Sequence, residues 1–334
     1  MTERVRNQKV DILRGIAAVL MILGHSFIVY PVNIASVPWC AAIEHFIYTF
    51  HMELFFILAG YVYHCIGYKN YIRKKIERIA LPYFVFGIGA MLLRAYGGSA
   101  INGTESIGEG IIKLLFRGGG YWFLYVLFLI FAIYPLIEKV LVNIKTEIAT
   151  AILILIATQF IHFPAFFEIG TVIHYLPYFM VGHGVAKVNM EGGGKKLTAK
   201  TTAGVLSLLV YILLDIHEYR SGDSLIPLLH FIRAVAISYV LYIIVFIIGE
   251  RNKTKAIRAI NDILIDCGKY SLQLYLFNGY LLTVIRIIIC NIFKVESPFI
   301  IVMAIWFGNV AITLTLCKCI LPKVPFLAKI CGIK

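Results

Sequence analysis

Residues 121–138 read YWFLYVLFLIFAIYPLIE, and no charged residue interrupts this run before its last position. An α-helix rises about 1.5 Å per residue, so the run is close to the ~20 residues that cross a hydrocarbon core of about 30 Å. The rest of the chain is similar: 60% of its 334 residues are hydrophobic and 15% are charged. In soluble domains, about 45–50% of the residues are hydrophobic and about 25% are charged. The composition predicts a lipid-embedded protein and excludes disordered, collagen-like and coiled-coil chains.

The hydrophobic pattern predicts an all-α polytopic membrane protein with about ten transmembrane helices. Several of the segments are shorter than the ~20 residues that a span needs, so their ends are set only to within a few residues. The predicted spans lie near residues 10–30, 43–64, 79–96, 121–138, 148–164, 173–187, 201–216, 227–249, 270–290 and 298–317.

The basic residues predict how these helices are oriented. With a cytoplasmic N-terminus, 23 of the 31 Lys and Arg residues fall on the cytoplasmic side and five on the other, while Arg14, Arg233 and Arg286 lie within spans. Cytoplasmic loops of membrane proteins carry such an excess, which favours a cytoplasmic N-terminus and C-terminus. The net charge of +13 is then an orientation signal and an attraction to anionic lipid, so we expect no nucleic-acid partner.

We expect one membrane-embedded domain over residues 1–334. A glycine-rich cytoplasmic loop near 188–200 separates the sixth helix from the seventh, and residues 318–334 form a short cytoplasmic interfacial tail. The seven cysteines form no CxxC pair and no ligand spacing with histidine, which indicates neither a disulfide framework nor a metal site.

The first predicted helix carries ionisable residues that are costly in lipid, namely Asp11, Arg14 and His25. Eleven residues turn an α-helix through about 1,100°, within roughly 20° of three full turns, and rise about 16 Å. Arg14 and His25 therefore share a face, with an anion-binding group at one end and a proton-transfer group at the other. The residues leave a second interpretation open, in which Arg14 snorkels to the headgroups and His25 bonds a neighbouring helix.

The second predicted helix carries a stripe at i, i+4, i+7 and i+11, formed by Glu44, Tyr48, His51 and Phe55. On consecutive antiparallel helices, His51 and His25 lie at similar depths and can face one cavity. Histidine exchanges protons near neutral pH, and a carboxylate can orient it. The alternative is a polar seam that holds two helices together.

Two further features are candidates for ligand contacts. The basic run from Arg73 to Arg78 is most often a topology signal, but a phosphate-rich cytoplasmic ligand also needs one. Trp122 follows Gly118–Tyr121 and is typical either of an interfacial anchor or of a pocket wall. The other histidines show no ligand spacing, and we expect them to be structural. They are His45, His64, His162, His174, His183, His217 and His230.

Six short blocks, in order along the chain, resemble those of the integral-membrane acyltransferase family 3. The first is similar to the family's Arg-x10-His signature, in which Arg14 and His25 stand. In the second, Glu53 replaces a usual proline and Ala59 a usual serine, and in the last Asn278 stands where many members have histidine. The blocks are Asp11–Ala17 with His25, Phe50–Tyr61, Arg73–Tyr83, Tyr121–Leu124, Tyr175–Gly182 and Gly268–Asn278.

The resemblance implies a plasma-membrane O-acyltransferase that moves an acetyl or similar short acyl group from cytoplasmic acetyl-CoA to a hydroxyl of an extracytoplasmic or lipid-linked cell-surface sugar. It implies catalytic roles for His25 as general base and for His51, Glu44 and Glu53 in orienting His25 or holding the sugar. The implied cofactor-binding residues are Arg14, Arg73 and Arg78 for the CoA phosphates and Trp122 as a stacking wall. We expect no metal, and the oligomeric state is not predicted.

A transporter or flippase that moves an acyl or glycolipid intermediate without chemistry is the alternative. It also requires many helices with buried ionisable residues, but it predicts repeat symmetry or paired broken helices, and no internal repeat is visible.

Overall fold

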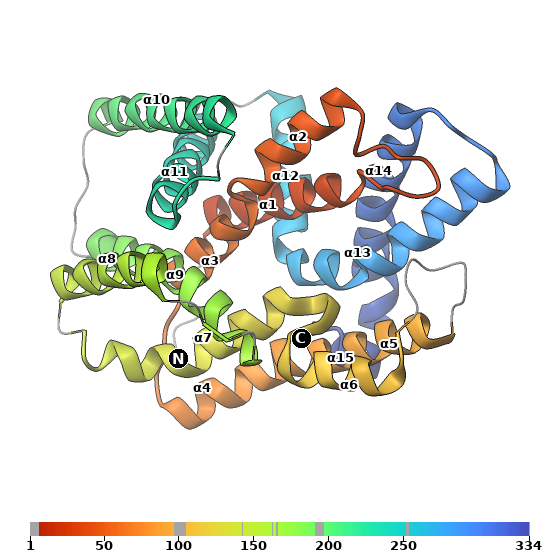
Figure 1. Ribbon diagram of the computed structural model, residues 1–334, viewed down its shortest axis with the longest axis horizontal. Helices are drawn as coiled ribbons and strands as arrows, with labels where there is room; N and C mark the ends of the chain where they lie inside the picture. Colours follow the sequence, from red (N-terminus) through yellow and green to blue (C-terminus); the bar gives the residue numbers. More distant parts are fainter. Residues whose placement is uncertain are drawn as a thin grey trace. The chain divides into compact units, whose positions relative to one another are not determined.

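The computed structural model describes residues 7–96, 105–141, 143–161, 163–164, 166–190, 197–222, 224–251 and 254–333 (Figure 1). Throughout these ranges the regular elements are helices, as predicted. The chain divides into two compact units. The first comprises Met1–Val62 and Tyr178–Ser271, and the second Tyr63–Pro177 and Leu272–Lys334.

Seven of the helices in the described residues are long and apolar enough to cross a membrane, and each coincides with a predicted span. Adjacent helices that continue one another count here as a single span. The seven are Pro38–Tyr61, Tyr68–Tyr96, Ile107–Glu138, Thr198–Ser221, Pro227–Ile247, Ser271–Ile292 and Pro298–Lys323.

The other three predicted spans are helices of a different character. Helix α1 (Gln8–His25) carries three charged side chains, Lys9, Asp11 and Arg14, along its 18 residues. Helix α8 (Ile144–Phe160) has only 17 residues. Helix α9 (Ile169–Met190) is less apolar because it contains histidines and Pro177. The prediction is therefore confirmed for seven of ten spans.

The first unit contains α1 and six further helical pieces. In it, α10 and α11 lie side by side, and α12 packs along α1 (Figure 1). The sequence interpretation treated residues 251–269 as a charged loop, but most of that stretch is helical. The pieces are α2 (Pro38–Tyr48), α3 (His51–Tyr61), α9 from Tyr178 onward, α10 (Leu197–Ser221), α11 (Pro227–Arg251) and α12 (Lys255–Lys269).

Glycines allow the helices of the first unit to approach one another backbone to backbone. A methyl group on Gly15 of α1 would overlap the carbonyl oxygen of Leu264, and one on Gly268 of α12 would overlap that of Asp11. These pairings make α1 and α12 antiparallel. Gly60 of α3 meets α9 in the same way. Small residues at crossings are typical of helix packing in membranes, because close backbones maximise van der Waals contact there.

The predicted second span is broken between α2 and α3. The amide groups of Thr49 and Phe50 bond three residues back, to Phe46 and Ile47, both at 3.3 Å, instead of four residues back. The Thr49 hydroxyl also donates to the Phe46 carbonyl at 2.7 Å. A single continuous stripe from Glu44 to Phe55 is therefore wrong, because the helix is interrupted in the middle of it.

The second unit is built around α7, whose buried polar groups are paired. Tyr134 donates to Glu147 of α8 at 2.6 Å, and Tyr63 donates to Glu138 at 2.8 Å. The elements of this unit are α4 (Tyr68–Lys75), the π-helix Ile76–Ala80, α5 (Leu81–Tyr96), α6 (Ile107–Phe116), α7 (Trp122–Glu138), α8, α9 up to Pro177, α13 (Ser271–Arg286), α14 (Pro298–Thr315) and α15 (Pro325–Ile330).

The predicted loop near 188–200 and the predicted tail at 318–334 are described to different extents by the structure. The central part of the loop near 188–200, residues 191–196, lies outside the described residues, as does His162. The predicted tail does contain a short helix, α15, although the last candidate span runs to Lys323 instead of ending before 318.

Candidate active site

Two histidines of the first unit lie on either side of Tyr48. His25 is the last residue of α1, Tyr48 the last of α2 and His51 the first of α3. The ring centroid of Tyr48 is 6.4 Å from that of His25 and 5.1 Å from that of His51. Gly24 permits this approach, since a methyl group there would stand 3.0 Å from the Tyr48 ring. The structure thus brings together His25 and His51, as the sequence predicts.

The hydrogen bonds of both histidines fix which ring nitrogen is basic. The Nδ1 atom of His25 lies 2.8 Å from the carbonyl oxygen of Met21, and Nδ1 of His51 lies 2.9 Å from that of Ile47. A carbonyl oxygen only accepts, so each Nδ1 carries the proton. In the neutral ring the lone pair is then on Nε2. The break between α2 and α3 supports this bond, because it leaves the Ile47 carbonyl in a shortened turn.

The two histidines differ in accessibility. His25 is exposed, whereas only 4% of His51 is exposed. An accessible imidazole with a defined lone pair can take a proton from a bound hydroxyl group. His51 is buried and its ring contacts the Tyr48 ring, so it is placed to position Tyr48.

A cavity of about 440 Å³ lies beside this group, in the same unit. Glu44 and Tyr48 are among its walls, so the predicted Glu44 lies close to the histidine pair but faces the cavity. The lining residues are Ala41, Glu44, His45, Tyr48, Thr49, Glu218, Ser224, Leu225, His230 and Arg233.

An ion-pair network at this cavity was not predicted from the sequence. Nε2 of His45 lies 3.1 Å from Asp215, and Arg233 contacts both Asp215, at 3.4 Å, and Glu218. The side chain of Arg233 is 3% exposed. The ligand atoms of His45, Asp215 and Glu218 lie within 4.8 Å of one another, as in a metal site. The guanidinium group of Arg233 already pairs with both carboxylates, so the arrangement is an ion-pair network.

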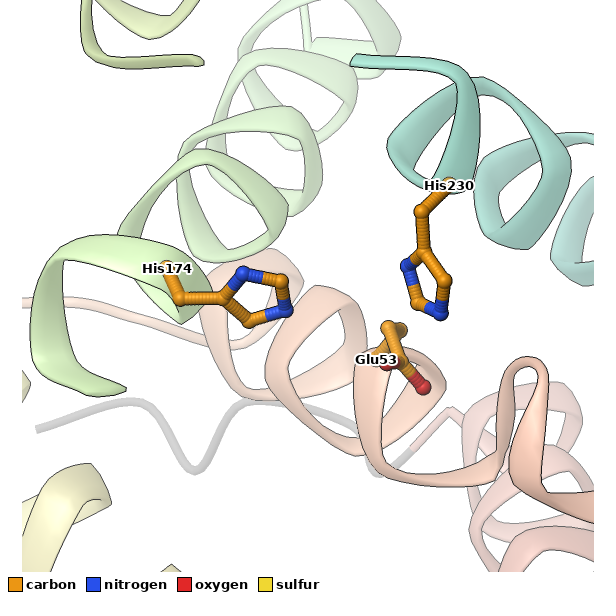
Figure 2. A group of neighbouring side chains, drawn as sticks. All are labelled: Glu53, His174 and His230. Carbon is orange, nitrogen blue, oxygen red and sulfur yellow. The ribbon is translucent and has the colours of Figure 1, made fainter. Parts of the chain in front are cut away.

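Glu53, predicted to orient His25 or to hold the sugar, is a buried residue of α3. It is 3% exposed, and its ligand oxygen lies within 4.8 Å of a ring nitrogen of His230 (Figure 2). His230 also bonds Tyr178 at 3.2 Å. Among the described residues, Oε2 of Glu53 has no hydrogen-bond partner. His174, drawn in the same figure, belongs to the second unit, where its ring packs on Tyr175.

The predicted donor-binding residues occupy three places. Arg14 is half-buried on α1, eleven residues before His25. In the second unit, Arg73 is exposed and pairs with Glu77 at 3.1 Å, and Arg78 is exposed on the following π-helix. Trp122 stacks on Tyr175 with centroids 5.5 Å apart.

Trp122 does not join the basic residues of its own unit. Helix α4 meets α7 at Ala132, whose carbonyl accepts from Tyr68 at 3.2 Å. Trp122 begins α7 ten residues earlier, about 15 Å along the axis. Its ring is held against Tyr175 within the second unit.

Sequence signals for the missed residues were present but weak. Arg233 is an arginine within a predicted span, and Asp215 and Glu218 stand at i and i+3 near the end of another. Neither signal indicates a partner, because the pairs join residues of different helices: Arg233 lies 15 residues from Glu218, and His45 lies 170 residues from Asp215. Tyr48 belongs to the stripe of the second predicted helix, but the stripe alone indicates no catalytic or binding role for it.

Comparison with known proteins identifies the family. A family model described as an acyltransferase domain, that of acyltransferase family 3, matches residues 7–321 and so takes in both units. Neither the search of curated proteins nor that of solved structures found a match. With this match over almost its whole length, and with seven helices able to span a bilayer, the chain belongs to acyltransferase family 3 and is a multi-pass membrane acyltransferase.

Proposed function

We propose that this protein is a plasma-membrane O-acyltransferase with His25 as its general base. It takes an acetyl or similar short acyl group from cytoplasmic acetyl-CoA and transfers it to a hydroxyl of an extracytoplasmic or lipid-linked cell-surface sugar. The observation that carries the proposal is the state of His25. Its Nδ1 is held by the Met21 carbonyl at 2.8 Å, which leaves the lone pair of the neutral ring on Nε2.

The reaction needs Nε2 to accept one proton and then to return it. Nε2 of His25 removes the proton of the acceptor hydroxyl as its oxygen attacks the thioester carbonyl. The carbon–sulfur bond then breaks, the ester forms, and the leaving CoA sulfur takes the proton. General-base help of this kind is typically worth about 10²–10⁴-fold in rate.

The donor is proposed to bind from the cytoplasmic end of α1. Arg14 lies eleven residues before His25, about 16 Å along the helix, which suits a donor with an anionic head and a reactive end. Its guanidinium group would contact a CoA phosphate. We assign the same kind of contact to Arg73 and Arg78, both exposed, and a stacking role to Trp122.

The remaining predicted residues act through their neighbours. The ring centroid of His51 is 5.1 Å from that of Tyr48, and His51 is proposed to hold Tyr48 against His25. Glu44 faces the adjacent cavity and is proposed to bind acceptor hydroxyls. Glu53 is buried with His230, so its role in this scheme is to position α3 against α11.

The test is release of CoA thiol by the purified protein reconstituted in liposomes. Acetyl-CoA is added outside, a crude lipid-linked glycan extract serves as acceptor, and orientation is checked by protease. The wild type should release CoA in an acceptor-dependent manner, and His25→Ala should lose this activity while still inserting into the bilayer.

His64→Ala is the matched control, because His64 is an exposed histidine outside the helices and is not one of the residues that line the cavity beside Tyr48. It should retain wild-type release. Activity retained by His25→Ala would refute the general-base assignment. No release and no acetyl-CoA binding by the wild type would refute the donor.

A further inference from the structure

The cavity beside Tyr48 has the size and lining of a small-molecule site. It lies where α2, α10 and α11 meet in the first unit, and its volume of about 440 Å³ falls within the ~300–1,000 Å³ that is usual for such sites. Its walls combine carboxylates, imidazoles, a guanidinium and hydroxyl groups with a few apolar side chains. In an apolar membrane chain, so many polar side chains around one space indicate a polar occupant.

Arg233 is the most unusual wall residue. Its side chain is 3% exposed, yet it lines the cavity. Its Nη1 contacts Asp215 and Glu218, while in the described part of the chain its Nε has no hydrogen-bond partner. Burying a charged group with an unused donor is costly, and function is a common reason for retaining one.

The lining also specifies the charge of the occupant. The carboxylates of Glu44 and Glu218 face the cavity, and Asp215 adds a third carboxylate to the network around a single guanidinium group. Negative charge therefore exceeds positive charge, and an anionic group here would meet repulsion with little compensation. Neutral hydroxyl groups, in contrast, can donate to the carboxylates and accept from Arg233 and the histidines. An amino group would also be favoured.

Tyr48 connects this cavity to the proposed base. Its side chain is 42% exposed and lines the cavity, and its ring packs edge to face on that of His25. Tyr48 is thus a wall residue of the cavity and a packing partner of His25 at the same time.

We propose that this cavity is the acceptor site and that it takes a neutral or amino sugar ring and excludes uronates and other acidic sugars. The inference rests on the proposed acyl transfer, and it adds the position of the acceptor and its charge class. Tyr48 is the wall residue past which a hydroxyl group of the bound sugar ring reaches His25.

Ligand-observed saturation-transfer NMR tests the site without acyl transfer. The purified protein is prepared in a zwitterionic detergent, because glycoside detergents would compete. The probes are methyl glucoside, methyl glucosaminide and methyl glucuronide, which share a ring and differ in charge. The first two should receive saturation from the protein, and the glucuronide should not.

Ser224→Trp supplies the blocking variant, because Ser224 is an exposed residue of the cavity wall in the segment between α10 and α11. It should abolish the signals of the two binding probes. Thr202→Trp is the matched control, since Thr202 is exposed on α10 some sixteen residues before Glu218 and about 24 Å from it along the helix. It should leave the signals intact.

Three outcomes would overturn the proposal: preferred binding of the glucuronide, signals that survive Ser224→Trp, or no binding of any probe. CoA release with the crude glycan extract is measured on the same preparations. If the NMR result fails while CoA release is retained, only the acceptor-site proposal is refuted. If CoA release is absent, the proposed acyl transfer, on which the acceptor site rests, is refuted.

Discussion

The ring of Tyr48 meets the ring of His25 edge to face, with centroids 6.4 Å apart and an interplanar angle of 80°. The two residues end successive helices, α1 and α2, so the contact fixes where those helix ends stand relative to each other. The Met21 carbonyl also fixes the imidazole, by accepting a hydrogen bond from Nδ1. His25 is therefore constrained by one hydrogen bond and one aromatic face, and its Nε2 has a defined direction.

Removing the aromatic face should slow acyl transfer. We expect Tyr48→Ala to lower kcat by about 10²-fold, because a reacting group displaced by about 1 Å loses that much. Tyr48→Phe keeps the ring and should retain most of kcat. Initial rates of CoA release at saturating acetyl-CoA measure both variants. Equal loss in the two variants would mean that the hydroxyl group, and not the packing, is what the reaction uses.

Arg14→Ala should weaken donor binding more than it slows turnover. A hydrogen bond to a charged group contributes about 1.5–3 kcal/mol, which corresponds to roughly ten- to hundredfold in Kd. Titration of the detergent-solubilised protein with acetyl-CoA measures the change directly. Arg258→Ala is the control, since Arg258 is an exposed arginine on α12. If Arg14 only anchors α1 at the headgroups, the two variants will bind acetyl-CoA equally.

The histidine pair is the part of the site that the sequence predicts well. The sequence predicts antiparallel helices for His25 and His51, and this arrangement places both residues at similar depths. In the structure, α2 lies between α1 and α3 in the chain, and its last residue, Tyr48, contacts both histidine rings. The break at Thr49 and Phe50 was not predictable in the same way, because no proline or glycine marks it. It depends on hydrogen bonds that form only in the packed structure.

The cavity network shows what periodicity cannot supply. His45 and Asp215 are 170 residues apart, and a single sequence gives no means of pairing them. The same limit applies to α12. Its charged residues predict a cytoplasmic loop when each residue is judged singly, whereas its packing on α1 depends on the match between Gly15 and Gly268.

The crossing of α1 and α12 should tolerate no side chain at Gly15. We expect Gly15→Ala to lower Tm in detergent, because the added methyl group would overlap the Leu264 carbonyl, and overpacking typically costs about 1–3 kcal/mol. The matched control is Gly279→Ala on α13, where in the described part of the chain no atom beyond the chain neighbours and the helix's own backbone lies within 4 Å of the added carbon. Alanine is the better helix former, so the control should be neutral or slightly stabilising. A Tm for Gly15→Ala equal to that of the control would show that the helices cross less closely.

Arg233 and Arg73 offer a comparison between a buried and an exposed ion pair. Arg233 is 3% exposed and contacts Asp215 and Glu218, whereas Arg73 is 78% exposed and pairs with Glu77. Arg233→Ala leaves two carboxylates facing each other and should cost about 3–5 kcal/mol, as breaking a buried pair does. Arg73→Ala should cost less than about 1 kcal/mol. Arg233→Lys should recover only part of the loss, because an ammonium group is more strongly hydrated than a guanidinium group and is less suited to a buried ion pair. Denaturant or thermal unfolding in detergent measures the stability of all three variants.

Equal stability of Arg233→Ala and Arg73→Ala would mean that water or lipid headgroups already screen the cavity network. The charge selection inferred for the acceptor would then lose its basis.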